Sequence, residues 1–213
     1  MKLGWFYWFA KVVVTMLLKL LWFFKVEHIN AIPERGPLLI VANHCSYFDP
    51  PVVGCAVPRT VRFFAKEELF HVPILRFLIR NLGAVPLRED IESVGAIRLA
   101  MKLLREGNAV CIFPEGTRSY TGEVAEFLDG ASYIALKVNT PILMVGIRGT
   151  FSVLPRGARF PRVWRRISVK TRLVNSPVEL LDRDPKEKLE ADRESMKELS
   201  SAMRREIIRL VKS

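Results

Sequence analysis

Cysteine and histidine are scarce in this chain, and their scarcity restricts its chemistry. The 213 residues include three cysteines and three histidines. Cys45, Cys55 and Cys111 show no zinc-ligand spacing, and an odd count does not suit a disulfide framework. We therefore expect reduced thiols in a cytosol-facing setting and no metal site.

The chain also lacks linker sequence and has fewer acidic than basic residues. The chain has no internal repeat, low-complexity segment or linker, so its length predicts one domain. Asp and Glu number 22 against 33 Lys and Arg, which gives a formal net charge of +11. This balance predicts an anionic partner: nucleic acid, a phosphorylated small molecule or anionic lipid. Because no nucleic-acid-binding module is recognisable, we expect no nucleic acid partner.

Charges are nearly absent from the first 25 positions. Trp5 to Phe24 include only Lys11 and Lys19 as charged residues, contain no proline, and carry aromatic residues at both ends. Twenty helical residues rise about 30 Å, which matches a bilayer core, and the aromatic residues resemble interfacial belts. A small-residue cleavage site is missing, which argues against a signal peptide. Residues 1–26 therefore predict a membrane-docking helix.

The two lysines bear on how this helix meets a bilayer. Lys11 and Lys19 lie about 80° apart on a helical wheel, and a lysine at the bilayer centre costs on the order of 3 kcal/mol. We expect the helix to lie in the interface or to insert partly, with both lysines turned to the headgroups. A spanning anchor with snorkelling lysines and an ordinary buried helix are the alternatives.

Short apolar runs alternate with helical patterns through residues 27–213. The predicted strands cover 38–41, 61–65, 83–88, 109–113, 141–147 and 165–174, and the predicted helices cover 73–81, 91–105 and 130–138. Another helix starts at Asp49, which suits the N-cap before Pro50, and a C-terminal helix starts at Asp184-Pro185. This order predicts an α/β fold with a single mostly parallel sheet flanked by helices.

A basic stretch runs from Arg156 to Arg172 with Phe160 and Trp164 interleaved and no acidic residue. It suits contact with anionic headgroups, each basic residue near such a surface contributing about 1 kcal/mol. Binding the phosphates of a cosubstrate is a second interpretation, and a solvated, arginine-rich strand and turn is the third.

Two stretches combine residues that suit proton transfer and anion binding. Asn43-His44-Cys45-Ser46-Tyr47-Phe48-Asp49 follows a buried strand and offers a base, His44, with a carboxylate, Asp49, to orient it; capping is the plainer role for Asp49. The second stretch is 113–119, Phe-Pro-Glu-Gly-Thr-Arg-Ser. There Gly116 permits close backbone approach and Arg118 offers a planar fork of donors for phosphate.

In an α/β fold both stretches lie at the carboxyl edge of the sheet. Lys66 and Arg88 end two other predicted strands and are expected beside them. A base, its orienting carboxylate and several cations at one edge describe a site that deprotonates an alcohol carried by a phosphate-bearing molecule.

These stretches closely resemble the first and third motifs of the glycerolipid acyltransferase family, which includes bacterial 1-acylglycerol-3-phosphate acyltransferases. Residues 66–69 and 83–88 resemble the second motif, and residues 140–150 resemble the fourth. Two positions depart from the pattern. Met144 stands where a second proline is usual, and Asp129 stands where a lysine often precedes the glycine; these bear on the acceptor pocket and on anion binding respectively.

The resemblance implies acyl transfer from acyl-carrier protein or acyl-coenzyme A to the sn-2 hydroxyl of 1-acylglycerol-3-phosphate. His44 is the implied general base and Asp49 orients it, without a covalent acyl-enzyme, cofactor or metal. Arg118 with Lys66 or Arg88 is implied to bind the phosphate. The remaining residues implied in that subsite are Glu115, Gly116 and Thr117. The implied location is the cytoplasmic face of the cell membrane.

Other interpretations stay open. The acceptor alternatives are glycerol-3-phosphate and another lysolipid, and a basic peripheral membrane protein without catalysis is a different class. Cys45 raises the possibility of a thiol nucleophile. Because neighbours in extended backbone point to opposite sides, we expect Cys45 to pack in the core instead.

Overall fold

The computed structural model describes residues 4–28, 30–87, 93–184 and 189–213. The strands are β1 (Lys25–His28), β2 (Leu38–Ala42), β3 (Val61–Lys66), β4 (Ala84–Leu87), β5 (Ala109–Ile112), β6 (Ile142–Arg148) and β7 (Ser168–Val174). The helices are α1 (Trp5–Trp22), α2 (Asp49–Ala56), η1 (Glu67–Phe70), α3 (Pro73–Asn81), α4 (Ser93–Arg105), α5 (Gly130–Val138), α6 (Thr150–Val153), α7 (Pro177–Leu180) and α8 (Arg193–Lys212).

The seven strands form one sheet in the order β1-β7-β6-β2-β5-β3-β4. Strands β2 to β6 are parallel, β7 is antiparallel to β6, and β1 is parallel to β7. The predicted mostly parallel sheet is therefore confirmed. In this arrangement the carboxyl ends of β2, β3, β5 and β6 and the amino ends of β1 and β7 share one edge.

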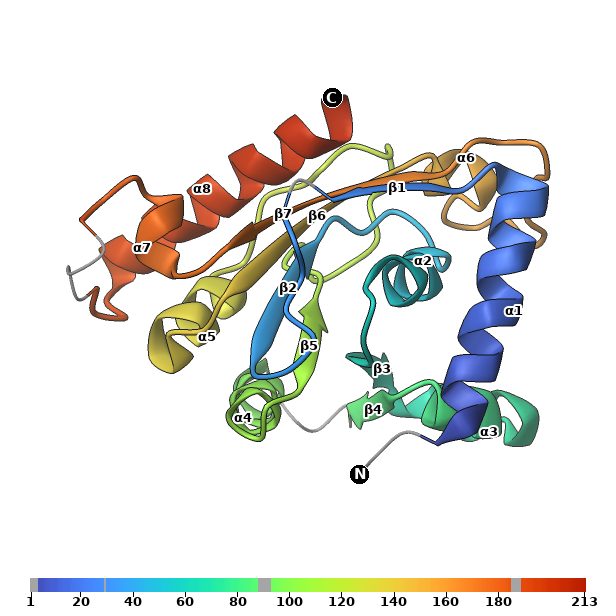
Figure 1. Ribbon diagram of the computed structural model, residues 1–213, viewed down its shortest axis with the longest axis horizontal. Coiled ribbons are helices and arrows are strands. Elements are labelled where there is room, and N and C mark those ends of the chain that lie inside the picture. The colour runs from blue at the N-terminus through green and yellow to red at the C-terminus, as the bar shows by residue number, and fades with distance from the viewer. Residues whose placement is uncertain (1–3, 29, 88–92, 185–188) are drawn as a thin grey trace.

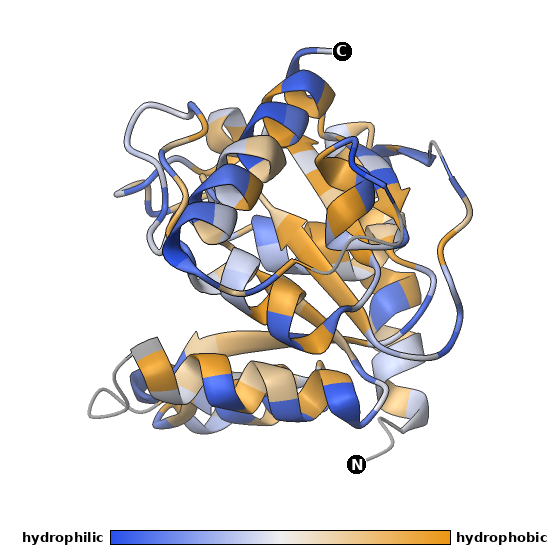
Figure 2. Cartoon of the chain, turned by 90° about the vertical axis from the view of Figure 1, so that its left-hand side faces the viewer, coloured by the Kyte–Doolittle hydropathy of each residue, from blue (hydrophilic) through white to orange (hydrophobic). Residues whose placement is uncertain are grey.

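Helices cover both faces of the sheet, which explains why its central strand is apolar throughout. All five residues of β2 are fully buried. Leu38, Ile40 and Ala42 pack in a core with α1 and α2, whereas Leu39 and Val41 pack in a second core with α4, α5 and α8. Figure 1 shows α1 and α2 on one side of the sheet and α5 and α8 on the other. Figure 2 shows hydrophilic and hydrophobic residues interspersed along the outer helices, in front of hydrophobic strands.

Helix α1 packs one side on the body and leaves the other exposed. The Tyr7 hydroxyl lies 3.3 Å from the Val61 amide at the amino end of β3, and Leu18 and Trp22 are buried in the core on that face. The ammonium of Lys11 donates to the Val57 carbonyl at the end of α2. Lys19 is exposed. The prediction that both lysines turn to the headgroups is therefore wrong for Lys11, because its ammonium donates to a carbonyl at the end of α2.

The outer side of α1 is apolar. Apart from Lys19, its exposed residues are apolar: Trp5, Trp8, Phe9, Val12, Val13, Met16, Leu17 and Leu20. Within the described residues, α1 alone is long and apolar enough to cross a membrane by length and composition. Strand β1 follows α1 after two residues and spans the predicted boundary between the docking helix and the acyltransferase domain, after residue 26. The chain therefore passes directly from the helix into the sheet.

The remaining predicted elements match closely except at one helix. Residues 73–81 and 130–138 are helical as predicted, and strands occur in each predicted segment. The C-terminal helix, however, begins at Arg193 and not at Asp184-Pro185. The Asp192 carboxylate accepts from the Ser195 amide at 2.8 Å and caps this helix. Leu189 fits the apolar repeat of α8 but precedes its first turn.

Candidate active site

His44 and Asp49 meet at the carboxyl end of β2. His44 Nδ1 lies 2.8 Å from Asp49 Oδ2, and the Asp49 side chain is fully buried. The imidazole is stacked on the Phe113 ring, which follows β5, with 4.2 Å between ring centroids. With Nδ1 engaged and 18% of the His44 side chain exposed, the Nε2 atom is the ring nitrogen left for a substrate.

Asp49 is held from behind by the backbone of its own loop. Its Oδ2 atom also accepts from the amides of Cys45 and Ser46, each at 2.7 Å. The predicted N-cap role of Asp49 is wrong: Phe48 is the N-cap, and Asp49 is the first helical residue. The Asp49 Oδ2 atom is taken by the amides of Cys45 and Ser46, which precede the helix. The carboxylate therefore turns back to its loop.

Asn43 ties this loop to β6. Its side-chain amide donates to the Ile147 carbonyl at 2.9 Å, and its oxygen accepts from the Ile147 amide at 2.7 Å. Asn43 is buried, so both bonds are shielded from water. This pair of hydrogen bonds fixes the backbone that carries His44, a positioning role that the sequence alone did not assign.

Glu115 joins the two predicted motifs. Its Oε1 atom accepts from the His44 amide at 2.7 Å, and its Oε2 atom accepts from the Ala125 amide at 3.0 Å. Burial raises the pKa of this carboxyl, and the two backbone bonds oppose that shift. The Ser119 amide donates to the His44 carbonyl at 2.8 Å. Glu115 therefore aligns the two loops through their backbones, while its predicted place in the phosphate subsite stays a prediction.

Arg118 reaches the catalytic loop through an aromatic ring. Its guanidinium lies over Tyr47, with 3.5 Å between Cζ and the ring centroid. Arg156 donates to Thr117 Oγ1 at 3.0 Å and to the Arg118 carbonyl at 3.2 Å. Its own guanidinium lies over the Tyr120 ring, with 4.0 Å to the centroid. Arg156 thus binds the turn that carries Arg118, and the sequence prediction missed both Tyr47 and Arg156.

Gly116 adopts a left-handed backbone with φ 70° in the turn between Phe113 and Thr117. Both Gly116 and Thr117 are exposed at the sheet edge. A Cβ at Gly116 would come within 2.9 Å of the Leu128 side chain. Glycine therefore suits both the conformation and the space at this turn.

Lys66 lies at the same edge, further along the sheet. Register pairs Phe63 with Cys111 and Cys111 with Ile40, which places Lys66 level with Asn43 across two strand spacings, roughly 10 Å. Its side chain is exposed. The structure thus places Lys66 at the predicted edge, two strands away from β2. Arg88 lies outside the described residues.

Cys45 is buried and faces away from the imidazole, as predicted. Its sulfur lies 3.5 Å from Thr150 Oγ1 and 3.8 Å from the Asn43 side-chain amide. Burial and the nearby charge of Asp49 raise the pKa of this thiol from 9.0 to about 12. A thiol that stays protonated in the core is not an activated nucleophile.

The two departures from the motif pattern lie in the core layer of α8. Met144 is fully buried there in β6. Asp129 Oδ1 accepts from Ser200 Oγ at 3.1 Å, and Ser200 is 2.9 Å from Ser132 Oγ. Because Ser200 of α8 donates to the Asp129 carboxylate, this side chain is held toward α8.

A family model described as acyltransferase matches residues 23–148 of this chain. The chain belongs to the acyltransferase family. It is 30% identical to the 1-acyl-sn-glycerophosphate acyltransferase PlsC from Thermotoga maritima, whose crystal structure superimposes with a TM-score of 0.71. The superposition covers 97% of this chain and 76% of the Thermotoga chain. The acyltransferase fold predicted from the motifs is therefore confirmed.

Curated relatives in the same family are named 1-acyl-sn-glycerol-3-phosphate acyltransferases. The chloroplast enzyme of Arabidopsis thaliana is 29% identical over 63% of this chain and 38% of its own length. The Borreliella burgdorferi enzyme is 32% identical over 56% of this chain and 48% of its own length. The acyltransferase chain thus spans about half the length, or less, of these relatives.

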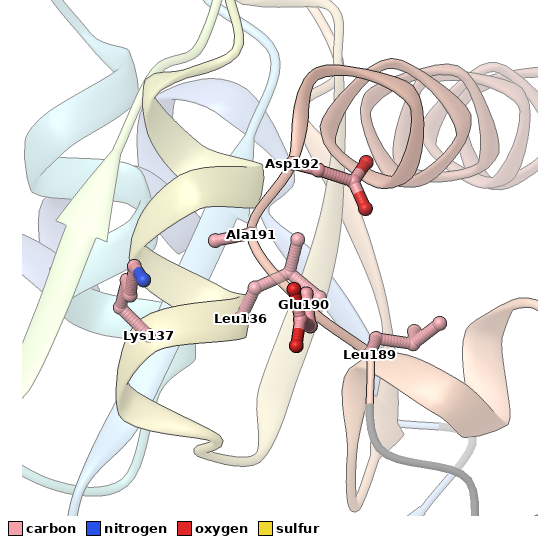
Figure 3. Close-up of a pocket in the computed structure, with 6 residues that line it drawn as sticks. All are labelled: Leu136, Lys137, Leu189, Glu190, Ala191 and Asp192. Carbon is pink, nitrogen blue, oxygen red and sulfur yellow. The ribbon is translucent and has the colours of Figure 1, made fainter.

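A surface hollow lies away from this acyltransferase site. It has a volume of about 540 Å³ and is lined by Leu136, Lys137, Leu189, Glu190, Ala191 and Asp192 (Figure 3). Leu136 and Lys137 belong to the last turn of α5, which leads into the amino end of β6. The hollow therefore belongs to the opposite edge of the sheet from His44.

Proposed function

We propose that this chain transfers a fatty acyl group from an acyl thioester to the sn-2 hydroxyl of 1-acylglycerol-3-phosphate, giving phosphatidic acid. The observation that carries the proposal is the 2.8 Å contact between His44 and Asp49 in a loop whose Tyr47 ring lies under Arg118. A base and a fixed cation then act on one acceptor that bears both a hydroxyl and a phosphate. The names of the curated relatives support the same acceptor.

The chemistry follows from the orientation of the imidazole. His44 Nε2 takes the proton of the acceptor hydroxyl as its oxygen attacks the thioester carbonyl carbon. Asp49 accepts from Nδ1–H, fixes the tautomer and stabilises the imidazolium. The tetrahedral intermediate collapses, the carbon–sulfur bond breaks, and the leaving thiolate takes the proton from His44. The products are an ester and a free thiol, without an acyl-enzyme.

Arg118 binds the acceptor phosphate in this proposal and so positions the hydroxyl. Gly116 and Thr117 line the same subsite through their exposed turn. Lys66 or Arg88 completes it as a further cation. Acyl-carrier protein or coenzyme A supplies the thioester as a cosubstrate, and the reaction needs neither a metal nor a cofactor.

We also propose that the site works at the cytoplasmic face of a membrane. The exposed apolar residues of α1 support a helix that lies in the bilayer interface, since its inner side is occupied by the protein body. Residues 1–26 then provide docking and residues 27–213 the catalysis.

The test is an assay of the purified chain with a panel of acceptors and an acyl donor labelled in its acyl group. The donor is either acyl-loaded acyl-carrier protein or acyl-coenzyme A. Phosphatidic acid should form from 1-acylglycerol-3-phosphate, while glycerol-3-phosphate and lysolipids without a phosphate monoester should react more slowly. His44→Ala should abolish the product and Cys45→Ala should retain it. Preference for another acceptor would correct the substrate, and no product from any acceptor by a folded chain would refute the enzyme proposal.

A further inference from the structure

Two exposed aromatic residues meet at the catalytic edge of the sheet in unusual backbone conformations. Phe23, which ends α1, has φ 49°, and Trp164, in the segment before β7, has φ 59°. Their rings lie 6.0 Å apart, and their side chains are 49% and 65% exposed. Bulky residues rarely adopt a left-handed backbone, and here the strain is not offset by burial.

This aromatic pair is fixed to the body on both sides. The Trp164 amide donates to the Leu21 carbonyl and the Ile167 amide donates to the Trp22 carbonyl, each at 2.9 Å. The Trp22 indole donates to the Arg162 carbonyl at 2.8 Å. Figure 1 shows the segment between α6 and β7 beside the C-terminal end of α1. The pair is therefore displayed by a rigid support.

The same support reaches the catalytic loop. The Trp22 ring packs on Phe48, the residue before Asp49, with 5.0 Å between ring centroids. Ser46 Oγ donates to the Leu154 carbonyl at 2.8 Å, just before the basic segment. Whatever binds Phe23 and Trp164 is thus brought next to the mouth of the site.

Arginines surround the pair. Besides Arg156, which binds the turn of Thr117, four exposed arginines stand in the segment between α6 and β7, and no ion pair found among the described residues involves them: Arg159, Arg162, Arg165 and Arg166. Phe160 and Val163 are also exposed. Aromatic residues interleaved with cations suit a bilayer interface, where the rings enter the headgroup layer and the cations bind anionic lipid.

We propose that Phe23, Trp164 and these four arginines form a second bilayer-contacting surface, specific for anionic phospholipid, at the mouth of the site. It continues the apolar outer side of α1 toward His44. The proposal rests on the proposed function only because a lipid acceptor would explain why the site needs a bilayer beside it. Lipid binding is measured separately from turnover. An acidic carrier protein and a second copy of this chain are the competing occupants.

The test exploits the backbone strain. Trp164→Gly removes the ring and suits the left-handed backbone, so the melting temperature should be unchanged or higher. Sedimentation of the full chain with phosphatidylglycerol–phosphatidylcholine vesicles should show binding reduced by about tenfold. Asn139→Gly is the matched control, because Asn139 has φ 47° at the opposite edge of the sheet, and its binding should equal that of the original chain.

A charge arm completes the experiment. Arg165→Gln with Arg166→Gln should weaken binding to these vesicles roughly 25-fold, at about fivefold per arginine. Lys197→Gln with Arg205→Gln removes the same charge from α8 and should have a much smaller effect. Vesicle binding of Trp164→Gly equal to that of the original chain would overturn the proposal. The proposal would also fail if the double arginine variant bound vesicles as the original chain does but lost binding to acyl-carrier protein. It would fail likewise if that variant bound vesicles unchanged but altered its oligomeric state.

The outcome is independent of the proposed reaction. If vesicle binding falls as expected but the original chain yields no acyl-transfer product, the surface stands and the proposed function fails. If the chain is active and Trp164→Gly alters turnover on detergent-dispersed acceptor without altering vesicle binding, the segment belongs to the substrate site and the surface proposal fails.

Discussion

The guanidinium of Arg118 lies over the Tyr47 ring, with Cζ 3.5 Å from the ring centroid. Tyr47 belongs to the loop that carries His44 and Asp49, and Arg118 belongs to the loop after β5. The stacking therefore couples the position of the cation that we propose to bind phosphate to the position of the proposed base. Such coupling matters because a phosphate and a hydroxyl of one acceptor must be held at a fixed separation.

Tyr47→Ala should raise KM for 1-acylglycerol-3-phosphate about fivefold, which corresponds to the loss of one partly exposed cation–π contact. Tyr47→Phe keeps the ring and should behave like the original chain. Steady-state kinetics with the acceptor varied and the acyl donor saturating separate KM from kcat. An equal loss in both variants would assign the effect to the hydroxyl and not to the ring.

Arg156 lies outside the segment that matches the family model, yet it binds the turn that presents Arg118. Arg156→Gln removes its bonds to Thr117 Oγ1 and the Arg118 carbonyl and takes away a neighbouring cation. We expect KM for the phosphate-bearing acceptor to rise roughly tenfold with a smaller change in kcat. Arg159→Gln, a nearby charge change without these bonds, is the control assayed on detergent-dispersed acceptor. Equal effects of the two variants would reduce the role of Arg156 to net charge.

Asp49→Asn tests the orienting carboxylate. An amide oxygen can still accept from the Cys45 and Ser46 amides, but the buried Oδ1 position, which has no hydrogen-bond partner among the described residues, would then hold a donor. We expect unfolding free energy to fall by about 1–2 kcal/mol and kcat to fall by roughly a hundredfold to ten-thousandfold, because a neutral amide does not stabilise the imidazolium. Urea unfolding and kcat measured on one preparation separate the effects. An unchanged kcat would leave Asp49 only its bonds to the loop backbone.

The sequence predicted the central strands of the sheet well because they are buried on both faces, whereas the largely exposed β1 was not predicted. Leu38 to Val41 and Ala109 to Ile112 are short apolar runs between turn residues, and such runs have few alternatives in an α/β chain. Prediction failed where a side chain chooses between nearby backbone donors. Asp49 and the start of α8 both depended on which amides a carboxylate binds, and apolar periodicity does not carry that information.

That His44, Asp49 and Arg118 lie at one edge of the sheet was predicted, but their connections were not. The motifs located His44, Asp49 and Arg118, and strand register explains why they share an edge. The stacking of Tyr47 under Arg118, the backbone bonds of Glu115 and the approach of Arg156 from a later segment depend on loop geometry. Contacts between residues so far apart in the chain leave no periodic signal in one sequence.

Thiol chemistry gives a pH test of the acid–base assignment. The pKa of Cys45 is raised to about 12, and burial also raises the pKa of Cys55 and Cys111. Alkylation with iodoacetamide at about pH 8 should therefore leave activity intact. Because the folded state favours the neutral thiol of Cys45, its contribution to stability is complete below about pH 9 and is lost as the pH rises toward 12, at about 1.4 kcal/mol per pH unit. Cys45→Ala should show a shallower fall in urea unfolding free energy over that window; rapid inactivation at pH 8 would contradict the buried, protonated thiol.

Gly149 tests how closely the basic segment approaches the site. It has φ 93° after β6, and a Cβ there would lie 2.0 Å from the Arg166 carbonyl oxygen. Gly157 has φ 89° but no atom within 4 Å of such a Cβ. Gly157→Ala should lower the unfolding free energy by only about 1 kcal/mol, the penalty of a left-handed alanine. Gly149→Ala should lower it by about 3 kcal/mol or more, because the backbone before β7 must also move. That movement displaces Arg166 and Trp164, so any folded fraction of Gly149→Ala should bind anionic vesicles less tightly than Gly157→Ala. Equal stabilities in urea titrations would show that the backbone does not make this close approach in solution.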